Sequence, residues 1–166
     1  MFLYLWGLRV PAAFAKCVGI YYLCKDVRLC AHTREKTIKT LNMKRVIATP
    51  DAPKAVGPYS QAIEVNGTLY ISGQIPVNPA DGKVQEDIVA AAHQSLKNIG
   101  AILKEAGMTY DNVVKTTVLL ADIADFKAVN EVYAEYFTGD KPARACYQAA
   151  ALPLGVKVEI EAIAVK

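Results

Sequence analysis

The sequence has 166 residues, 53% of them hydrophobic, which suits one compact domain with its own core and excludes an intrinsically disordered chain. The net charge of +3 is spread unevenly: residues 1–42 carry seven Lys and Arg side chains and two acidic ones, whereas residues 43–166 carry twelve and fourteen. Because the larger segment is mildly acidic, it offers no dense basic field to a polyanion, and we do not expect a nucleic-acid partner.

Cysteine and histidine are too scarce in residues 43–166 to build a disulfide framework or a metal site. Cys146 is the single cysteine of this segment, and His93 is its single histidine. A reducing compartment is therefore the simpler expectation, and no metal is predicted.

Residues 1–42 begin with an apolar stretch, but Arg9, Pro11 and Lys16 divide it into runs shorter than the roughly 18 residues of a membrane span. We therefore expect no transmembrane helix. Three interpretations stay open for this segment: an upstream translation start ahead of Met43, an organellar presequence, or a genuine additional segment. The first predicts a cytoplasmic protein whose domain is residues 43–166, and the second predicts a mitochondrial one.

Three strands are predicted at the start of the domain. Residues 44–49 form the first candidate. Residues 62–65 and 68–72 flank Asn66-Gly67, a dipeptide that favours a two-residue hairpin turn because both of its residues tolerate positive φ. We therefore predict an antiparallel hairpin here.

Residues 73–87 contain two prolines and two glycines and predict a long ordered connection, where functional residues often collect. A helix is predicted over residues 88–106, because apolar residues recur there at helical spacing and Gly107 follows as a helix C-terminal glycine. The apolar positions of this helix are Ile88, Ala92, Leu96, Ile99 and Leu103.

The remaining elements are a strand, a helix and two further strands. Residues 113–120 are rich in branched side chains and predict a buried strand. Asp122 or Asp125 is expected to cap the next helix. Residues 143–152 and 156–165 then predict the last two strands. The buried stripe of the second helix is predicted to be Phe126, Val129, Tyr133 and Phe137.

The order β-β-β-α-β-α-β-β indicates an α+β fold with a mixed sheet and both helices packed on one face. No repeat or low-complexity tract suggests a second architecture.

Arg144 is the only strongly charged residue in its neighbourhood, and in an extended strand it shares a face with Cys146 and Gln148. Its planar fork of donors matches a carboxylate bidentately. Two partners are open: a glutamate of the last strand, in a structural ion pair, or a small carboxylic acid. An exposed ion pair contributes only about 0–1 kcal/mol, so stability is a weak reason for placing both charges here.

In the last strand, Glu159 and Glu161 share one face with the aliphatic residues Ile163 and Val165. At least one of the two glutamates is therefore expected at the edge of a buried region. Because the connection between the last two strands is short, we expect these strands to be neighbours, with Arg144 near Glu159. Burial should raise the pKa of Glu159, and Arg144 should lower it.

Five segments carry a family resemblance, in order and at consistent spacing. They are AVGPYSQA (55–62), ISGQIP (71–76), VNEVYAEYF (129–137), PARACYQ (142–148) and KVEIEAIAV (157–165). With these segments, residues 43–166 resemble the reactive intermediate deaminase family, also called the Rid or YjgF family. The resemblance implies a chorismate-mutase-like fold and a homotrimer whose active sites lie between subunits. It also implies hydrolysis of 2-imino acids such as 2-iminobutanoate and 2-iminopropanoate to 2-oxo acids and ammonia, without a cofactor.

The same resemblance implies roles for individual residues. Arg144 matches the arginine that grips the substrate carboxylate, and Glu159 matches the carboxylate that positions the attacking water. The other matching positions, which line or shape the pocket, are Tyr59, Ser72, Gly73, Asn130, Ala145 and Cys146.

Structural alternatives stand beside these roles. Tyr59 is alternatively a turn anchor, Ser72 and Gly73 a strand end, and Asn130 a solvated helix residue. Cys146 is interpreted as a small buried side chain rather than a nucleophile, because no histidine of these motifs activates it. His93 and Glu161 are interpreted as structural.

Three functions remain open on this basis. The first is an imine deaminase in which Arg144 holds the substrate and Glu159 is the general base. The second is a non-catalytic regulatory protein that binds small carboxylic acids with the same arginine. The third is a ribonuclease or translation inhibitor, against which the acidic domain and the lack of a histidine pair both count.

Overall fold

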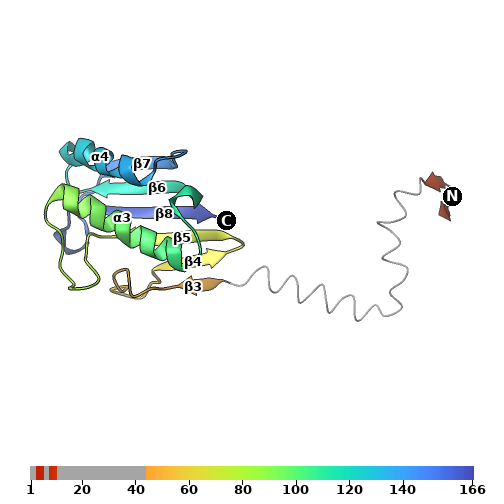
Figure 1. The fold of residues 1–166 in the computed structure, drawn as a ribbon, viewed down its shortest axis with the longest axis horizontal. Helices are drawn as coiled ribbons and strands as arrows, with labels where there is room; N and C mark the ends of the chain where they lie inside the picture. Colours follow the sequence, from red (N-terminus) through yellow and green to blue (C-terminus); the bar gives the residue numbers. More distant parts are fainter. Residues whose placement is uncertain (1–2, 6–7, 11–43) are drawn as a thin grey trace. The chain divides into compact units, whose positions relative to one another are not determined.

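The computed structural model describes residues 3–5, 8–10 and 44–166, and the chain divides into two units, 1–42 and 43–166 (Figure 1). In the first unit, β1 (Leu3–Leu5) pairs antiparallel with β2 (Leu8–Val10). The interpretation of residues 1–42 as an upstream start or presequence falls mainly outside the described residues and stays a prediction. No helix in the described part of the chain is long and apolar enough to cross a membrane.

The second unit is built on a six-stranded mixed sheet with the strand order β3-β4-β5-β8-β6-β7. Neighbouring strands are antiparallel except β6 and β7, which are parallel because α4 (Phe126–Tyr136) connects them. The expected mixed sheet is thus confirmed. The strands are β3 (Arg45–Ile47), β4 (Ala62–Val65), β5 (Thr68–Gln74), β6 (Val113–Leu120), β7 (Ala143–Gln148) and β8 (Val158–Val165).

The hairpin between β4 and β5 turns at the predicted dipeptide. Asn66 has φ of 52° and Gly67 has φ of 76°, so both residues are left-handed, as a tight hairpin turn with this twist requires. The pairing of Val65 with Thr68 then fixes the register along both strands.

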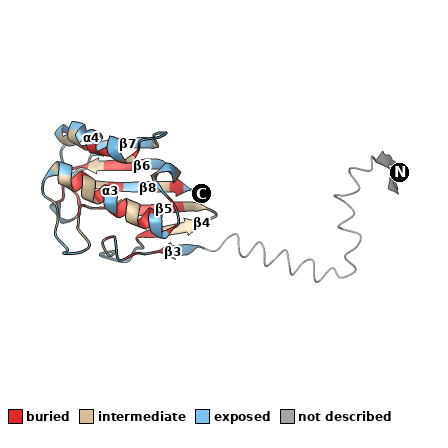
Figure 2. Ribbon diagram, in the orientation of Figure 1, coloured by how far each residue is buried: buried red, intermediate tan, exposed pale blue. Residues whose placement is uncertain are grey.

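Both helices of the second unit cover the same face of the sheet (Figure 1). α3 (Ile88–Glu105) begins where the Asp87 carboxylate accepts a hydrogen bond from the Ala90 amide, 2.9 Å away. It ends before Gly107, which has φ of 71°. α4 (Phe126–Tyr136) packs against α3 and against the β6 side of the sheet. The core lies between these helices and the sheet (Figure 2).

Some predicted details are wrong. Phe126 was expected in the buried stripe of α4 but is 40% exposed, because it starts the helix at the outer edge of the sheet. The strand predicted over 143–152 ends at Gln148, and a 3-10 turn (Pro153–Gly155) leads into β8. Asp122 accepts a hydrogen bond from the Ala124 amide in a preceding 3-10 turn, whereas Asp125 makes no capping hydrogen bond to α4.

On the opposite face of the sheet, no helix of residues 44–166 is packed, and we call it the open face. Along β8, buried residues alternate with residues that point to this face. Figure 2 shows the change of burial along the strands. The β8 residues of the open face are Glu159, Glu161, Ile163 and Val165.

Candidate active site

Arg144 lies on β7, at the edge of the sheet, and its side chain points to the helix-covered face. Strand pairing places it directly opposite Thr116 of β6, which is buried under α4. The carbon atom of its guanidinium group is 4.7 Å from the centre of the Tyr133 ring and 5.6 Å from that of Phe126. The guanidinium therefore rests on two aromatic rings of α4.

This guanidinium is exposed to solvent, and none of the ion pairs between described residues involves it. The alternative of a structural Arg144–glutamate pair is therefore wrong within the described part of the chain. Stacking on a ring uses the flat face of a guanidinium and leaves its edge, with the N–H donors, free for a planar anion.

Cys146 follows Arg144 on the same face of β7, and Ala145 points to the open face, as alternation requires. The Cys146 side chain packs partly against the core. Burial raises the pKa of its thiol, and the nearby Arg144 guanidinium only partly opposes this effect. The thiol is therefore protonated at neutral pH, in agreement with its interpretation as a packing residue.

Asn130 lies on α4 between Phe126 and Tyr133 in sequence. It follows Phe126 by four residues and precedes Tyr133 by three, which places all three on one side of the helix. Asn130 is half-buried. Asn130 thus shares a side of α4 with the two rings that contact Arg144, and we call Arg144, Cys146 and Asn130 the edge cluster.

Glu159 belongs to a second group, on the open face. Its strand neighbours there are Leu119 of β6 and, beyond it, Tyr147 of β7. Its carboxylate lies over Gly73 so closely that a Cβ atom added to this glycine would be 2.7 Å from Glu159 Cδ. Gly73 thus provides the space that the carboxylate occupies.

The Glu159 carboxyl is half-buried and has a raised pKa. Burial is the main cause, and the negative charge of Glu161 adds to it. The expectation that Arg144 lowers this pKa is wrong for the single chain, because the guanidinium lies on the other face of the sheet. A carboxylate with a raised pKa is a better proton acceptor at neutral pH than an ordinary one.

Ser72 and Gly73 lie together in an irregularity of the β5–β8 pairing, between Ile71 and Gln74. Two residues of β5 stand opposite one of β8 here, as in a β-bulge. The Ser72 hydroxyl donates a hydrogen bond to the Ser60 carbonyl oxygen, 2.7 Å away. Gly73 and Ser72 thus form, with Glu159, the group that we call the open-face cluster.

Tyr59 precedes this region in the chain and is 51% exposed. Its hydroxyl accepts a hydrogen bond from the Val56 amide at 3.2 Å, so within the chain it closes the loop before β4. This hydrogen bond fits the turn-anchoring alternative, and the pocket-lining role of Tyr59 stays a prediction.

Two predictions about the pair of charged residues are corrected by the sheet. β6 lies between β7 and β8, so these strands are not neighbours. Arg144 aligns through Thr116 with Ala162, three residues from Glu159 along β8. The two Cα atoms are thus about 10 Å apart across the strands and about 10 Å along them, and the side chains point to opposite faces.

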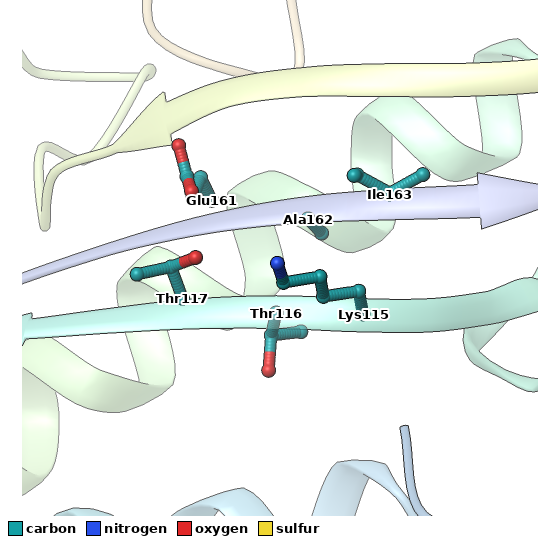
Figure 3. Close-up of a pocket in the computed structure, with 6 residues that line it drawn as sticks. All are labelled: Lys115, Thr116, Thr117, Glu161, Ala162 and Ile163. Carbon is teal, nitrogen blue, oxygen red and sulfur yellow. The ribbon is translucent and has the colours of Figure 1, made fainter. Parts of the chain in front are cut away.

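A shallow hollow of about 50 Å³ lies beside Glu161 on the open face (Figure 3). Figure 3 shows Lys115 and Thr117 of β6 and Glu161 and Ile163 of β8 on the side of the sheet away from the helices. Among the described residues, no three His, Cys, Asp or Glu side chains gather in a way that would hold a metal ion.

Sequence reasoning missed the aromatic support of Arg144. Tyr133 and Phe126 have helical spacing, which equally predicts a core stripe, and Thr116 is an unremarkable strand residue. The only available signal was that Phe126 opens its helix, where a stripe begins to leave the core.

Three comparisons place the chain among known proteins. Residues 49–166 match the family described as Endoribonuclease L-PSP. The chain is 58% identical over 125 residues to the 2-iminobutanoate/2-iminopropanoate deaminase of Mus musculus, covering 75% of this chain and 93% of that protein. It is 54% identical over 122 residues to Reactive Intermediate Deaminase A, chloroplastic, of Arabidopsis thaliana, covering 73% and 65%.

The fold is shared with a solved structure as well. That of E. coli TdcF with bound serine is 42% identical, covers 74% of this chain and 98% of that one, and has a TM-score of 0.72. The expected α+β fold is thereby confirmed. The family match spans well over half of the sequence, and the identities extend across the whole domain, so this chain belongs to the Endoribonuclease L-PSP family, the reactive intermediate deaminases.

Proposed function

We propose that this protein is a hydrolytic deaminase that converts 2-imino acids, with 2-iminobutanoate and 2-iminopropanoate as the first candidates, to 2-oxo acids and ammonia. The relatives that carry this activity in their names are up to 59% identical over the domain. The observation that carries the proposal is the pair of clusters: an exposed guanidinium that forms no ion pair with a carboxylate of residues 44–166, and a half-buried carboxylate with a raised pKa.

The reaction needs few groups. Arg144 binds the substrate carboxylate through its free N–H donors, which orients the neighbouring C=N carbon. Glu159 takes a proton from a water molecule as the oxygen bonds to this carbon of the protonated imine, and a neutral tetrahedral carbinolamine forms. Glu159 then returns the proton to nitrogen and the C–N bond breaks. As the carbonyl forms, the hydroxyl proton passes through Glu159 to the departing ammonia. The products are a 2-oxo acid and ammonium.

The other predicted residues have supporting roles in this scheme. Gly73 leaves room for the Glu159 carboxylate, and Ser72 holds the bulge in place. Ala145 and Cys146 line the strand beside Arg144, and Asn130 and Tyr59 offer an amide and a ring at the rim. No residue of the scheme requires a metal or an organic cofactor.

The scheme also requires an assembly, because Arg144 and Glu159 lie on opposite faces of one sheet. A small acid cannot touch both in a single chain, so the proposed site joins the edge cluster of one copy to the open-face cluster of the next. Such a contact is head-to-tail, and it closes into a ring when the rotation permits. A homotrimer with three shared sites is the assembly that we propose.

An assay with imines made in situ tests the proposal. A dehydratase generates 2-iminobutanoate or 2-iminopropanoate, the remaining imine is trapped, and ammonia release is compared between wild type, Arg144→Ala and Glu159→Gln. We expect acceleration by wild type and a loss of about 10²-fold or more in each variant. Wild type that leaves both imines at their spontaneous rate of decay refutes the proposal.

A second candidate is the non-catalytic binder of small carboxylic acids, which the structure of TdcF with bound serine favours. Glu159→Gln distinguishes the two: a deaminase variant keeps affinity for 2-oxobutanoate and loses ammonia release, whereas a binder shows no acceleration even as wild type. RNA cleavage by highly purified protein, with Arg144→Ala as control, tests the ribonuclease activity that the family description suggests.

Location follows from the true start of translation. We propose a cytoplasmic protein if Met43 is the start, and a mitochondrial one if residues 1–42 act as a presequence. One relative is named as chloroplastic, so organellar members exist in the family. The mass of the N-terminal peptide from cells distinguishes these cases.

A further inference from the structure

Arg144 is a long side chain on an exposed edge strand, yet its guanidinium lies over the rings of Tyr133 and Phe126. Residues of this kind lose much rotamer freedom when they bind a ligand, unless they are already ordered. The contacts around the guanidinium therefore bear on how well it can bind a carboxylate.

Tyr133 is the main contact, since its ring lies 4.7 Å from the guanidinium carbon. The ring is itself fixed: Tyr133 is only 6% exposed, and its ring centre is 4.4 Å from that of Phe137, with 31° between the planes. A ring held in one orientation gives the guanidinium a fixed aromatic face on which to stack.

Thr116 fixes the other end of Tyr133. Its hydroxyl lies 2.8 Å from the Tyr133 hydroxyl, and both are buried. Thr116 is also the residue of β6 that pairs directly with Arg144. A triangle results: strand pairing joins Arg144 to Thr116, a hydrogen bond joins Thr116 to Tyr133, and stacking joins Tyr133 to Arg144.

We propose that Tyr133, held by Thr116, is a positioning residue that pre-orients Arg144 for the substrate carboxylate. This inference rests on the proposed function and names a residue that acts through Arg144. Phe126 supports the same guanidinium from the exposed side, 5.6 Å from its carbon. The hydroxyl of Tyr133 performs no proton transfer, because burial keeps it protonated and Thr116 occupies it.

Tyr133→Leu removes the ring face. Because Arg144 binds the carboxylate in both the ground state and the transition state, we expect KM to rise about fivefold while kcat changes less than about twofold. Tyr133→Phe keeps the ring and loses the Thr116 bond, so its KM should rise about twofold at most. Thr116→Val should behave like Tyr133→Phe, since it removes the same hydrogen bond.

Tyr136→Leu is the matched control. Tyr136 is another partly buried tyrosine of α4, but its ring packs on Tyr110 and its hydroxyl bonds to His93, away from Arg144. Both Leu variants should melt at lower temperature than wild type, and only Tyr133→Leu should change KM when assayed well below its melting temperature. Phe126→Leu, at an exposed site, replaces Tyr133→Leu if the latter does not fold.

Two further measurements separate this inference from the proposed function. ¹⁵N relaxation of the Arg144 Nε–H group reports its order without any substrate, and titration with 2-oxobutanoate reports carboxylate affinity without catalysis. Order and affinity should both fall in Tyr133→Leu and stay at wild-type values in Tyr136→Leu. If wild type hydrolyses no imine yet these changes occur, the proposed function fails and the positioning role stands. Equal Arg144 order in wild type and Tyr133→Leu overturns the positioning role.

Discussion

The two faces of β8 differ in burial. Four of its residues lie under the helices with at most 2% of their surface exposed: Val158, Ile160, Ala162 and Ala164. The residues that alternate with them point to the open face. One row across the open face pairs Val46, Ile63, Tyr70, Ile163 and Lys115 in register. Val46 is 56% exposed and Tyr70 48% exposed. The side chains of the helix-covered face are buried by α3 and α4. The open face instead displays apolar side chains on the same side of the sheet as the half-buried Glu159.

This difference indicates where each kind of residue finds its partner. Substitutions on the helix-covered face should act through folding of the single chain. Substitutions on the open face should act through assembly and chemistry, because a contiguous exposed apolar surface commonly marks an interaction site. The same type of substitution on the two faces therefore tests the comparison.

The largest expected effect comes from the matched pair Leu96→Ala and Leu119→Ala. Leu96 of α3 is fully buried, so its truncation should lower the free energy of unfolding by about 2–5 kcal/mol. Leu119 points to the open face and is half-buried, so its truncation should lower the stability of the single chain by about 1 kcal/mol or less.

Urea denaturation at two protein concentrations checks this pair. The loss in Leu96→Ala should exceed that of Leu119→Ala at both concentrations, and only Leu119→Ala should change the dependence on concentration. Equal, concentration-independent losses would mean that the open face is supported within the chain.

The second-largest effect is expected from substituting two glycines, because each one leaves space that a neighbouring side chain occupies. A Cβ atom on Gly73 would press on Glu159, and one on Gly100 of α3 would lie 3.0 Å from Tyr110 Cζ. Gly73→Ala should therefore displace the Glu159 carboxylate and lower kcat about tenfold or more, with little loss of stability. Gly100→Ala should disturb the Tyr110 hydrogen bond to the Leu96 carbonyl, costing about 1–3 kcal/mol while activity stays near wild type.

Thermal unfolding and imine hydrolysis, measured on the same two preparations, check this prediction. The comparison of faces breaks down if Gly73→Ala unfolds at lower temperature than Gly100→Ala, or if Gly100→Ala loses activity as a folded protein.

Local signals predicted the parts of the fold that local interactions determine. Asn66-Gly67 specified its hairpin because the turn requires positive φ at both residues, and the spacing of α3 specified its buried side. Alternation also placed Arg144 and Cys146 on one face of β7. The placement of β6 between β7 and β8 was not predictable, since pairing between distant strands decides it, and this placement separates Arg144 from Glu159.

The sequence predicted which residues belong to the candidate site, but not how they are arranged in space. Alternation cannot tell which face of an edge strand the helices cover, so the side of Arg144 was unknown from the sequence. The exposure of Phe126 depends on where α4 starts relative to the edge of the sheet. The spacing of apolar residues along the sequence does not predict that position.

A smaller effect concerns the pH dependence of Glu159→Gln. The folded-state pKa of Glu159 is raised above its ordinary value of 4.5 by burial and then by Glu161, so its contribution to stability is fully present below pH 4.5 and is lost as the pH rises through the folded-state pKa. The Gln variant carries no charge and avoids this loss. Melting temperatures should therefore match at low pH, and the variant should melt higher at neutral pH.

Glu161→Gln serves as the control, because it removes the second cause and leaves the first. Its pH profile should lie between those of wild type and Glu159→Gln. A Glu159→Gln variant that melts below wild type at neutral pH would mean that the carboxylate has a stabilising partner in the folded protein.

The smallest effect comes from Glu64, a carboxylate with the opposite environment. Its oxygens accept hydrogen bonds from Lys166 Nζ at 2.6 Å and from Arg45 Nε at 2.9 Å, and these partners, Lys166 first, lower its pKa below 4.5. Its stabilising effect is therefore present above pH 4.5 and is lost as the pH falls through the folded-state pKa. Because both partners are exposed, Glu64→Gln should lower stability by about 1 kcal/mol or less at neutral pH, less still in high salt, and not at all at low pH. Glu64→Gln and Glu159→Gln should thus shift the melting temperature in opposite directions at neutral pH, and shifts of the same sign would contradict the contrast between a carboxylate paired within the chain and one left for a ligand.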